Sequence, residues 1–151
     1  MASPIKGRAT IRTAAVLLLA SAVLEILDYN SAVALFGGVR VGAVAVIYHF
    51  LFTALYFLSG IGLWTASPWG YWALMITTAT YTFDKVQLIL FPKAFYDYII
   101  MQLTVTREIV GMLPQDQLLH YFMIGYAVLV LCWWGFAWYI HARRQYFHQT
   151  G

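Results

Sequence analysis

The sequence predicts an all-α fold, an integral membrane four-helix bundle with an additional interfacial helix between the third and fourth spans. Composition is the first reason: of the 151 residues, 62% are apolar or aromatic and only 10% are charged. An ordinary soluble domain has about 45–50% apolar and about 25% charged residues. A soluble domain of this size could not bury so much apolar side chain, because small domains have much surface for their volume. A soluble enzyme is therefore almost excluded, as is a disordered chain.

The second reason is that four apolar blocks reach the length of about 20 residues that crosses a bilayer as a helix. Strands are not expected, because the blocks are long and lack a sustained alternation of apolar and polar residues. A chain in lipid must also satisfy its backbone hydrogen bonds internally, as continuous helices do. Residues 1–151 are expected to form a single membrane domain with spans at about 11–29, 41–64, 69–91 and 118–140.

The first block is the weakest of the four. Arg12 lies at one end, where its long side chain can reach the head groups, and Glu25 and Asp28 lie near the other end. A cleaved signal peptide is the alternative, because a basic start precedes the apolar stretch 13–24, and Ala20-Ser21-Ala22 has the pattern of a cleavage site. We favour a first span over a signal peptide.

The connections between the blocks favour helical hairpins. The link 65–68 joins the second and third blocks, with Ser67 suited to cap a helix and Pro68 to begin one. These two spans are therefore expected to run antiparallel. Residues 30–40 join the first two blocks and contain Gly37-Gly38, which predicts a turn.

The connection between the third and fourth blocks is too long and too apolar for a plain loop. An interfacial helix is predicted over about 94–113, because polar residues such as Asp97 and Glu108 fall on one helical face among apolar neighbours. A short strand through 103–105 is the competing interpretation.

The cationic side chains predict the orientation of the chain. With four spans both termini lie on one side, and by the positive-inside rule that side is the cytoplasm, most simply at a bacterial inner (plasma) membrane. The six tryptophans fall near the same face, as interface anchors do. The cations behind the net charge of +3 lie mainly at the two ends of the chain, which suits membrane orientation better than nucleic-acid binding. No nucleic-acid partner is therefore expected. The cations on the cytoplasmic side would be Lys6, Arg8, Arg12, Arg143 and Arg144.

Several polar side chains lie within the spans, where they are costly and usually face the interior of a bundle. At about 1.5 Å per helical residue, Glu25 lies about 6 Å, His49 about 12 Å and Asp84 about 10 Å below the outer boundary. Three different spans thus place polar groups in the outer half of the membrane. They predict a polar pocket that opens outward and binds a ligand. The residues expected to line it are Glu25, His49, Tyr56, Tyr81, Asp84 and Gln87.

The residues leave the ligand and any cofactor unspecified. A lipid, a quinone or a proton-coupled solute suits a polar pocket beside aromatic rings and open to the bilayer. Hydrogen bonds that merely hold helices together are an equally weighted explanation. No metal centre is expected, because the sequence has no His-x-x-x-His or Glu-x-x-His pair. No nucleophile–base pair is visible either, so no catalytic residue is assigned and an enzyme is disfavoured.

The stretch Gly60-Ile61-Gly62-Leu63-Trp64, followed by Pro68-Trp69-Gly70, resembles a pattern common in small bacterial four-span membrane proteins of uncharacterised families. The resemblance covers only the hairpin between the second and third spans. It implies the four-span bundle and carries over no catalytic residue. The favoured function is a small membrane protein that binds, or helps to move, a small or amphiphilic ligand. The alternative is a non-catalytic subunit or assembly factor of a larger membrane complex, and a homo-oligomer is compatible with either.

Overall fold

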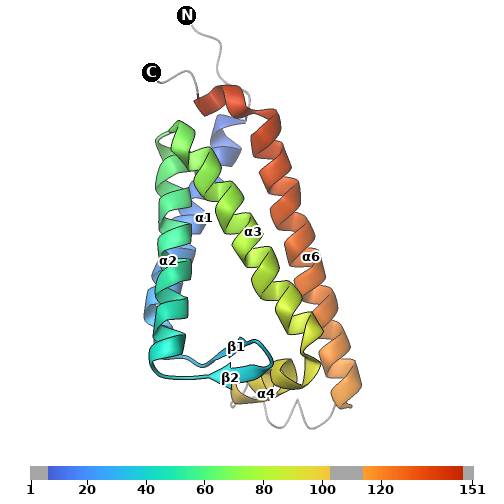
Figure 1. Ribbon diagram of the computed structural model, residues 1–151. Helices are drawn as coiled ribbons and strands as arrows, with labels where there is room; N and C mark the ends of the chain where they lie inside the picture. The colour runs from blue at the N-terminus through green and yellow to red at the C-terminus, as the bar shows by residue number, and fades with distance from the viewer. Residues whose placement is uncertain (1–6, 103–113, 148–151) are drawn as a thin grey trace, which may run out of the picture. The chain divides into compact units, whose positions relative to one another are not determined.

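The computed structural model describes residues 7–102 and 114–147, which are mostly helical (Figure 1). Each of the four apolar blocks forms a long helix, and a short helix follows the third. The helical elements are α1 (Arg8–Leu27), α2 (Ala43–Trp64), α3 (Pro68–Leu90), α4 (Pro92–Gln102), α6 (Gln115–Ala142) and the 3-10 helix η2 (Arg144–Phe147).

Three helices are long and apolar enough to cross a membrane, namely α1, α2 and residues 116–142 of α6. The fourth long helix, α3, has 23 residues. It carries four threonines together with Asp84 and Lys85, and it is not among the three. The helices predicted over the four blocks are confirmed, and three of them have the length and composition that a bilayer requires.

By their contacts, the described residues divide into two compact units. Unit 1 contains residues 7–29, 49–79 and 133–147, and unit 2 contains residues 30–48, 80–102 and 114–132. The helices α2, α3 and α6 each contribute residues to both units. The single membrane domain therefore stays a prediction, and each unit is described by itself.

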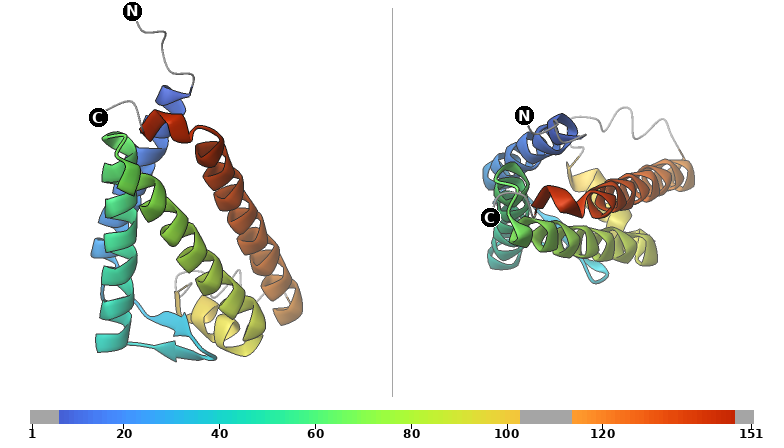
Figure 2. Two further views of the ribbon diagram at one scale, coloured as in Figure 1. Left: turned by 45° about the horizontal axis from the view of Figure 1, so that its top comes forward. Right: turned by 90° about the horizontal axis from the view of Figure 1, so that it is seen from above.

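In unit 1, α1 packs antiparallel against α2. Gly60 of α2 faces α1 so closely that a Cβ there would lie 2.8 Å from the Leu19 side chain and 3.1 Å from the Ala15 carbonyl oxygen. Closer to the start of α1, the Arg12 guanidinium lies over the Trp64 ring, 5.1 Å from its centroid. Figures 1 and 2 show α1 running alongside α2. The glycine allows the two backbones to approach, as small residues do between membrane helices.

The hairpin between α2 and α3 is held by close backbone contact and by buried hydroxyl groups. A Cβ on Gly62 would overlap the backbone of Gly70. Farther along both helices, the hydroxyl groups of Ser59 and Thr77 form a hydrogen bond of 2.8 Å, and both side chains are fully buried. These contacts are those of two antiparallel helices. Pro68 is the first helical residue, as predicted.

Unit 2 contains a β-hairpin, which corrects the all-α prediction. β1 (Val33–Leu35) pairs antiparallel with β2 (Gly38–Arg40), with Leu35 opposite Gly38. Phe36 and Gly37 between the strands have positive φ angles of 47° and 77°. Two consecutive residues with positive φ reverse the chain in a two-residue turn whose twist suits paired strands. The predicted turn is therefore present, and it joins two strands.

The short helix α4 packs against this hairpin in unit 2 (Figure 2). Phe95 and Ile99 of α4 are buried in a cluster with Ala34, Leu88 and Leu118. The first part of the predicted interfacial segment is thus helical, and one face of it is covered by protein. Residues 103–113, with the competing strand 103–105, lie outside the described residues.

Candidate functional site

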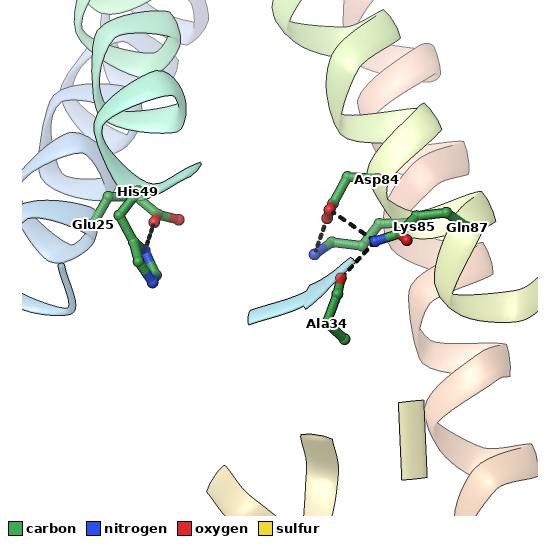
Figure 3. A network of polar contacts seen from close by, with 6 residues as sticks. All are labelled: Glu25, Ala34, His49, Asp84, Lys85 and Gln87. Carbon is green, nitrogen blue, oxygen red and sulfur yellow. Dashed lines mark hydrogen bonds and ion pairs between the residues drawn. The ribbon is translucent and has the colours of Figure 1, made fainter. Parts of the chain in front are cut away.

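The first polar group joins the end of α1 to the start of α2 in unit 1. Glu25 lies two residues before α1 ends, and antiparallel packing brings it opposite His49. The Nδ1 atom of His49 lies 2.7 Å from Oε2 of Glu25, with 9% of the His49 side chain and 25% of the Glu25 side chain exposed (Figure 3). This short contact fits a hydrogen bond from a neutral ring or an ion pair with a protonated one.

The same face of α2 carries two further groups, one and two turns beyond His49. The hydroxyl oxygen of Thr53 is buried and has no hydrogen-bond partner among residues 7–102 and 114–147. Tyr56 is buried, and its ring stacks on that of Trp133 with 6.1 Å between centroids. The face therefore combines a paired carboxylate and imidazole, an unsatisfied hydroxyl group and an aromatic wall.

The second polar group lies on α3 in unit 2. Asp84 is 5% exposed, and its Oδ2 atom lies 2.7 Å from Nζ of Lys85. The Lys85 ammonium also lies 5.1 Å from the centroid of the Tyr81 ring and 4.9 Å from that of Tyr126. The rings provide π faces that attract a cation, and the carboxylate balances its charge.

Gln87 connects α3 to the hairpin of unit 2. Its Nε2 atom donates a hydrogen bond of 2.6 Å to the carbonyl oxygen of Ala34 (Figure 3). Its Oε1 atom accepts one of 2.7 Å from the backbone N–H of Phe36. The same Nε2 atom lies 3.5 Å from Oδ1 of Asp84. Both ends of the amide are thus engaged, which gives Gln87 a positioning role.

The six residues predicted to line the pocket fall into two groups of three. Glu25 is half-buried and the other five are buried. Within unit 1, Glu25 contacts His49, and within unit 2, Asp84 contacts Gln87. A single pocket shared by the two groups stays a prediction. Unit 1 contains Glu25, His49 and Tyr56, whereas unit 2 contains Tyr81, Asp84 and Gln87.

Lys85 and Tyr126 were not among the six residues predicted to line the pocket, although the sequence offered Lys85 as a structural partner of Asp84 and Tyr126 as a residue closing the pocket from the fourth block. Lys85 follows Asp84 directly, so the two side chains leave the helix about 100° apart. The sequence signal was Tyr81, four residues before Lys85 and therefore on the same helical face. Tyr126 comes from a distant part of the chain, so its approach depends on how α3 and α6 pack.

No three side chains of the metal-binding types gather at one place in the described part of the chain. The polar groups can instead hold a proton, at Glu25 and His49, or a buried charge pair, at Asp84 and Lys85. The glycines of the motif in 60–70 have a direct structural use, since Gly62 and Gly70 are in backbone contact. No protein-family model, no curated protein and no solved structure matches the chain.

Proposed function

We propose that this protein is a four-span integral membrane protein of a bacterial inner membrane, with both termini cytoplasmic, that binds or helps to move a small or amphiphilic ligand. Three helices of spanning composition support the membrane setting. At about 1.5 Å per residue, α3 is also long enough to cross. Its two charges form an ion pair with each other, which reduces the cost of placing them in a bilayer.

The observation that carries the proposal is the contact of 2.7 Å between Glu25 and His49. An imidazole is the side chain that ordinarily changes its charge between about pH 5 and 8. In the hydrogen-bonded pair, the carboxylate beside the ring would balance the charge of a protonated imidazole. Carboxylate and histidine groups in this setting mark ion and proton pathways. A proton-coupled ligand is therefore the form of the proposal that the pair favours.

An amphiphilic ligand is supported by a hollow on α6 in unit 2. Its volume is about 310 Å³. Tyr126 lines this hollow, and the same ring lies 4.9 Å from the Lys85 ammonium. The apolar part of a lipid or quinone could pack in this hollow, next to the aromatic ring of Tyr126 and the Lys85 ammonium. The lining residues are Tyr121, Phe122, Gly125, Tyr126 and Leu129.

The test is purification in mild detergent followed by organic extraction and mass spectrometry. We expect a lipid or quinone to accompany the wild-type protein. Glu25→Gln and the double variant Asp84→Asn/Lys85→Met, which leaves no unpaired buried charge, should each lower its amount while leaving the elution profile unchanged. Asp28→Asn is the matched control, because it removes one carboxylate from an exposed position just beyond α1. Equal ligand content in the wild type and in both variants would reject the proposal.

A non-catalytic membrane subunit is the second candidate, and the surface of α6 favours it. Leu131 is 71% and Trp138 is 75% exposed, and a Cβ on Gly125 or Gly135 would touch nothing within 4 Å. A partner helix could pack closely against such a surface. Co-purification of a protein in fixed stoichiometry, with no bound amphiphile, would favour this function.

A further inference from the structure

A separate hollow of about 320 Å³ lies in unit 1, where α3 begins and α6 ends. None of its lining residues belongs to the two polar groups described above. It is lined by Pro68, Tyr71, Trp72, His141, Arg144 and Phe147. His141 precedes Arg143 and Arg144 in the basic C-terminal part of the chain, a setting typical of a solvated side chain. The structure instead places its Nδ1 atom 2.8 Å from the Tyr71 hydroxyl group, although the ring stays exposed.

The walls of this hollow are fixed by aromatic packing. The 3-10 helix η2 turns back after α6, and its Tyr146 and Phe147 side chains are 3% and 2% exposed. The Phe147 ring contacts that of Tyr71, with 6.3 Å between centroids, and Tyr71 contacts Trp72 edge-on at 5.3 Å. Because η2 is anchored in this way, the backbone of Arg144, its first residue, is fixed beside the hollow that Arg144 lines.

The hollow is cationic. Arg144 is exposed and forms no ion pair with a carboxylate of the described residues, and no aspartate or glutamate lines the hollow. Arg143 is adjacent, stacked 3.7 Å from the centroid of the Tyr139 ring. Gly7, just before Arg8, lies against the same Tyr139 and Arg143 side chains. An anion is therefore the ligand that this end of unit 1 attracts.

The ends of several helices meet here within unit 1, and exposed tryptophans accompany them. Trp64 is the last residue of α2, and Trp69 and Trp72 lie in the first turns of α3. All three tryptophans are exposed. Tryptophans and basic residues of this kind lie at the level of lipid head groups. Basic pockets between membrane helices on the cytoplasmic side bind anionic head groups.

We propose that this hollow binds the phosphate of an anionic membrane lipid. The planar Arg144 guanidinium can bind two phosphate oxygens at once, and the Nε2 atom of His141 can donate a further hydrogen bond. Trp72 and Tyr71 would then pack against the glycerol and upper acyl region of the lipid, and Phe147 would support the Tyr71 ring from within. The site rests on the membrane setting of the proposed function but lies outside its ligand-binding groups, so a loss of ligand binding at those groups would leave this site standing.

The experiment measures the binding of phosphatidylglycerol and phosphatidylcholine to the full-length protein in mild detergent, by native mass spectrometry and by the shift in Tm. We expect phosphatidylglycerol to bind more tightly and to raise Tm more. Arg144→Gln should weaken its binding about tenfold, the scale of a lost charge-assisted hydrogen bond. Arg144→Lys should weaken the binding less than Arg144→Gln, because lysine keeps the positive charge but cannot bind two phosphate oxygens at once as the planar guanidinium does. Since Arg144 is exposed, these variants are expected to fold.

Arg8→Gln is the matched control, because it removes an exposed cation from the same end of unit 1 without touching the lining of the hollow. It should leave most of the preference for phosphatidylglycerol. An equal loss in Arg8→Gln and Arg144→Gln would overturn the site and indicate a diffuse charge effect. Equal binding of the two lipids would also overturn it. The same Tm shift with millimolar inorganic phosphate would show a soluble anion in place of the lipid head group.

Discussion

The Lys85 ammonium lies 2.7 Å from the Asp84 carboxylate, although the two residues are neighbours on α3. Adjacent side chains leave a helix about 100° apart, so the flexible lysine stem must bend back to make this contact. The ammonium also lies 5.1 Å from the centroid of the Tyr81 ring and 4.9 Å from that of the Tyr126 ring, both of which attract a cation. The two charges therefore stabilise each other in a place where little water can reach them.

Removing only the cation of this pair is expected to be costly. Lys85→Met leaves the Asp84 carboxylate buried and unpaired, which should lower the free energy of unfolding by about 3 kcal/mol. The double variant Asp84→Asn/Lys85→Met should recover most of the loss, because no buried charge remains. Thermal unfolding in mild detergent measures both. A double variant no more stable than Lys85→Met would show that the pair is not what stabilises this part of α3.

Gln87→Met should loosen the hairpin from α3. The variant loses hydrogen bonds to the Ala34 carbonyl oxygen and the Phe36 N–H, with an expected cost of about 1–3 kcal/mol. Hydrogen exchange at the Phe36 amide should become faster. Gln102→Met is the control, since it removes a single bond of 3.2 Å, to the Ala32 carbonyl oxygen. An unchanged exchange rate at Phe36 in Gln87→Met would contradict the role given to Gln87.

Enlarging Gly60 should separate α1 from α2. In Gly60→Leu the new side chain meets Leu19 and the Ala15 backbone, and such overpacking costs about 1–3 kcal/mol. Gly135→Leu on α6 is the control, because a Cβ there touches nothing within 4 Å. Denaturation curves in detergent should show a lower midpoint for the Gly60 variant alone. Equal midpoints for the two variants would show that α1 and α2 are not closely packed at Gly60.

The first apolar block should be retained in the purified protein. Ile11 and Ala15 of α1 are fully buried, and α1 supplies the partner of His49. Cleavage after Ala22 would remove most of this packing. The intact mass of protein purified through a C-terminal tag decides the question. A mass that lacks the first 22 residues would establish the signal-peptide alternative.

The length of the apolar blocks was sufficient to predict the long helices, because a run of about 20 apolar residues is much too long for a strand and has the length of a membrane-spanning helix. Pro68 as a helix start was also predictable, since proline fits the first helical position. The strands 33–35 and 38–40 were not predictable. Three residues are too few for a visible alternation, and Phe36 gives no sign that it will adopt a positive φ.

The candidate site shows the same limit at the level of side chains. The positions of Glu25 and Asp84 within apolar blocks predicted that they would avoid lipid, and both are at least partly buried. Their partners depend on the register between helices, which block lengths do not determine. The pairing of Glu25 with His49 follows from the approach of α1 to α2, and that approach depends on the missing side chain at Gly60.

The two hydrogen bonds of Gln87 have a mechanical consequence for unit 2. They attach the tip of the loop between the first and second long helices to the third, one helical turn from Asp84. If the part of α3 around Gln87 tilted or moved along its axis, the two hydrogen bonds would carry Phe36 and the rest of the loop with it. A movement of α3 caused by neutralising Asp84 would therefore change the position of the exposed loop, and a fluorophore attached to the loop or an antibody against it would detect that change.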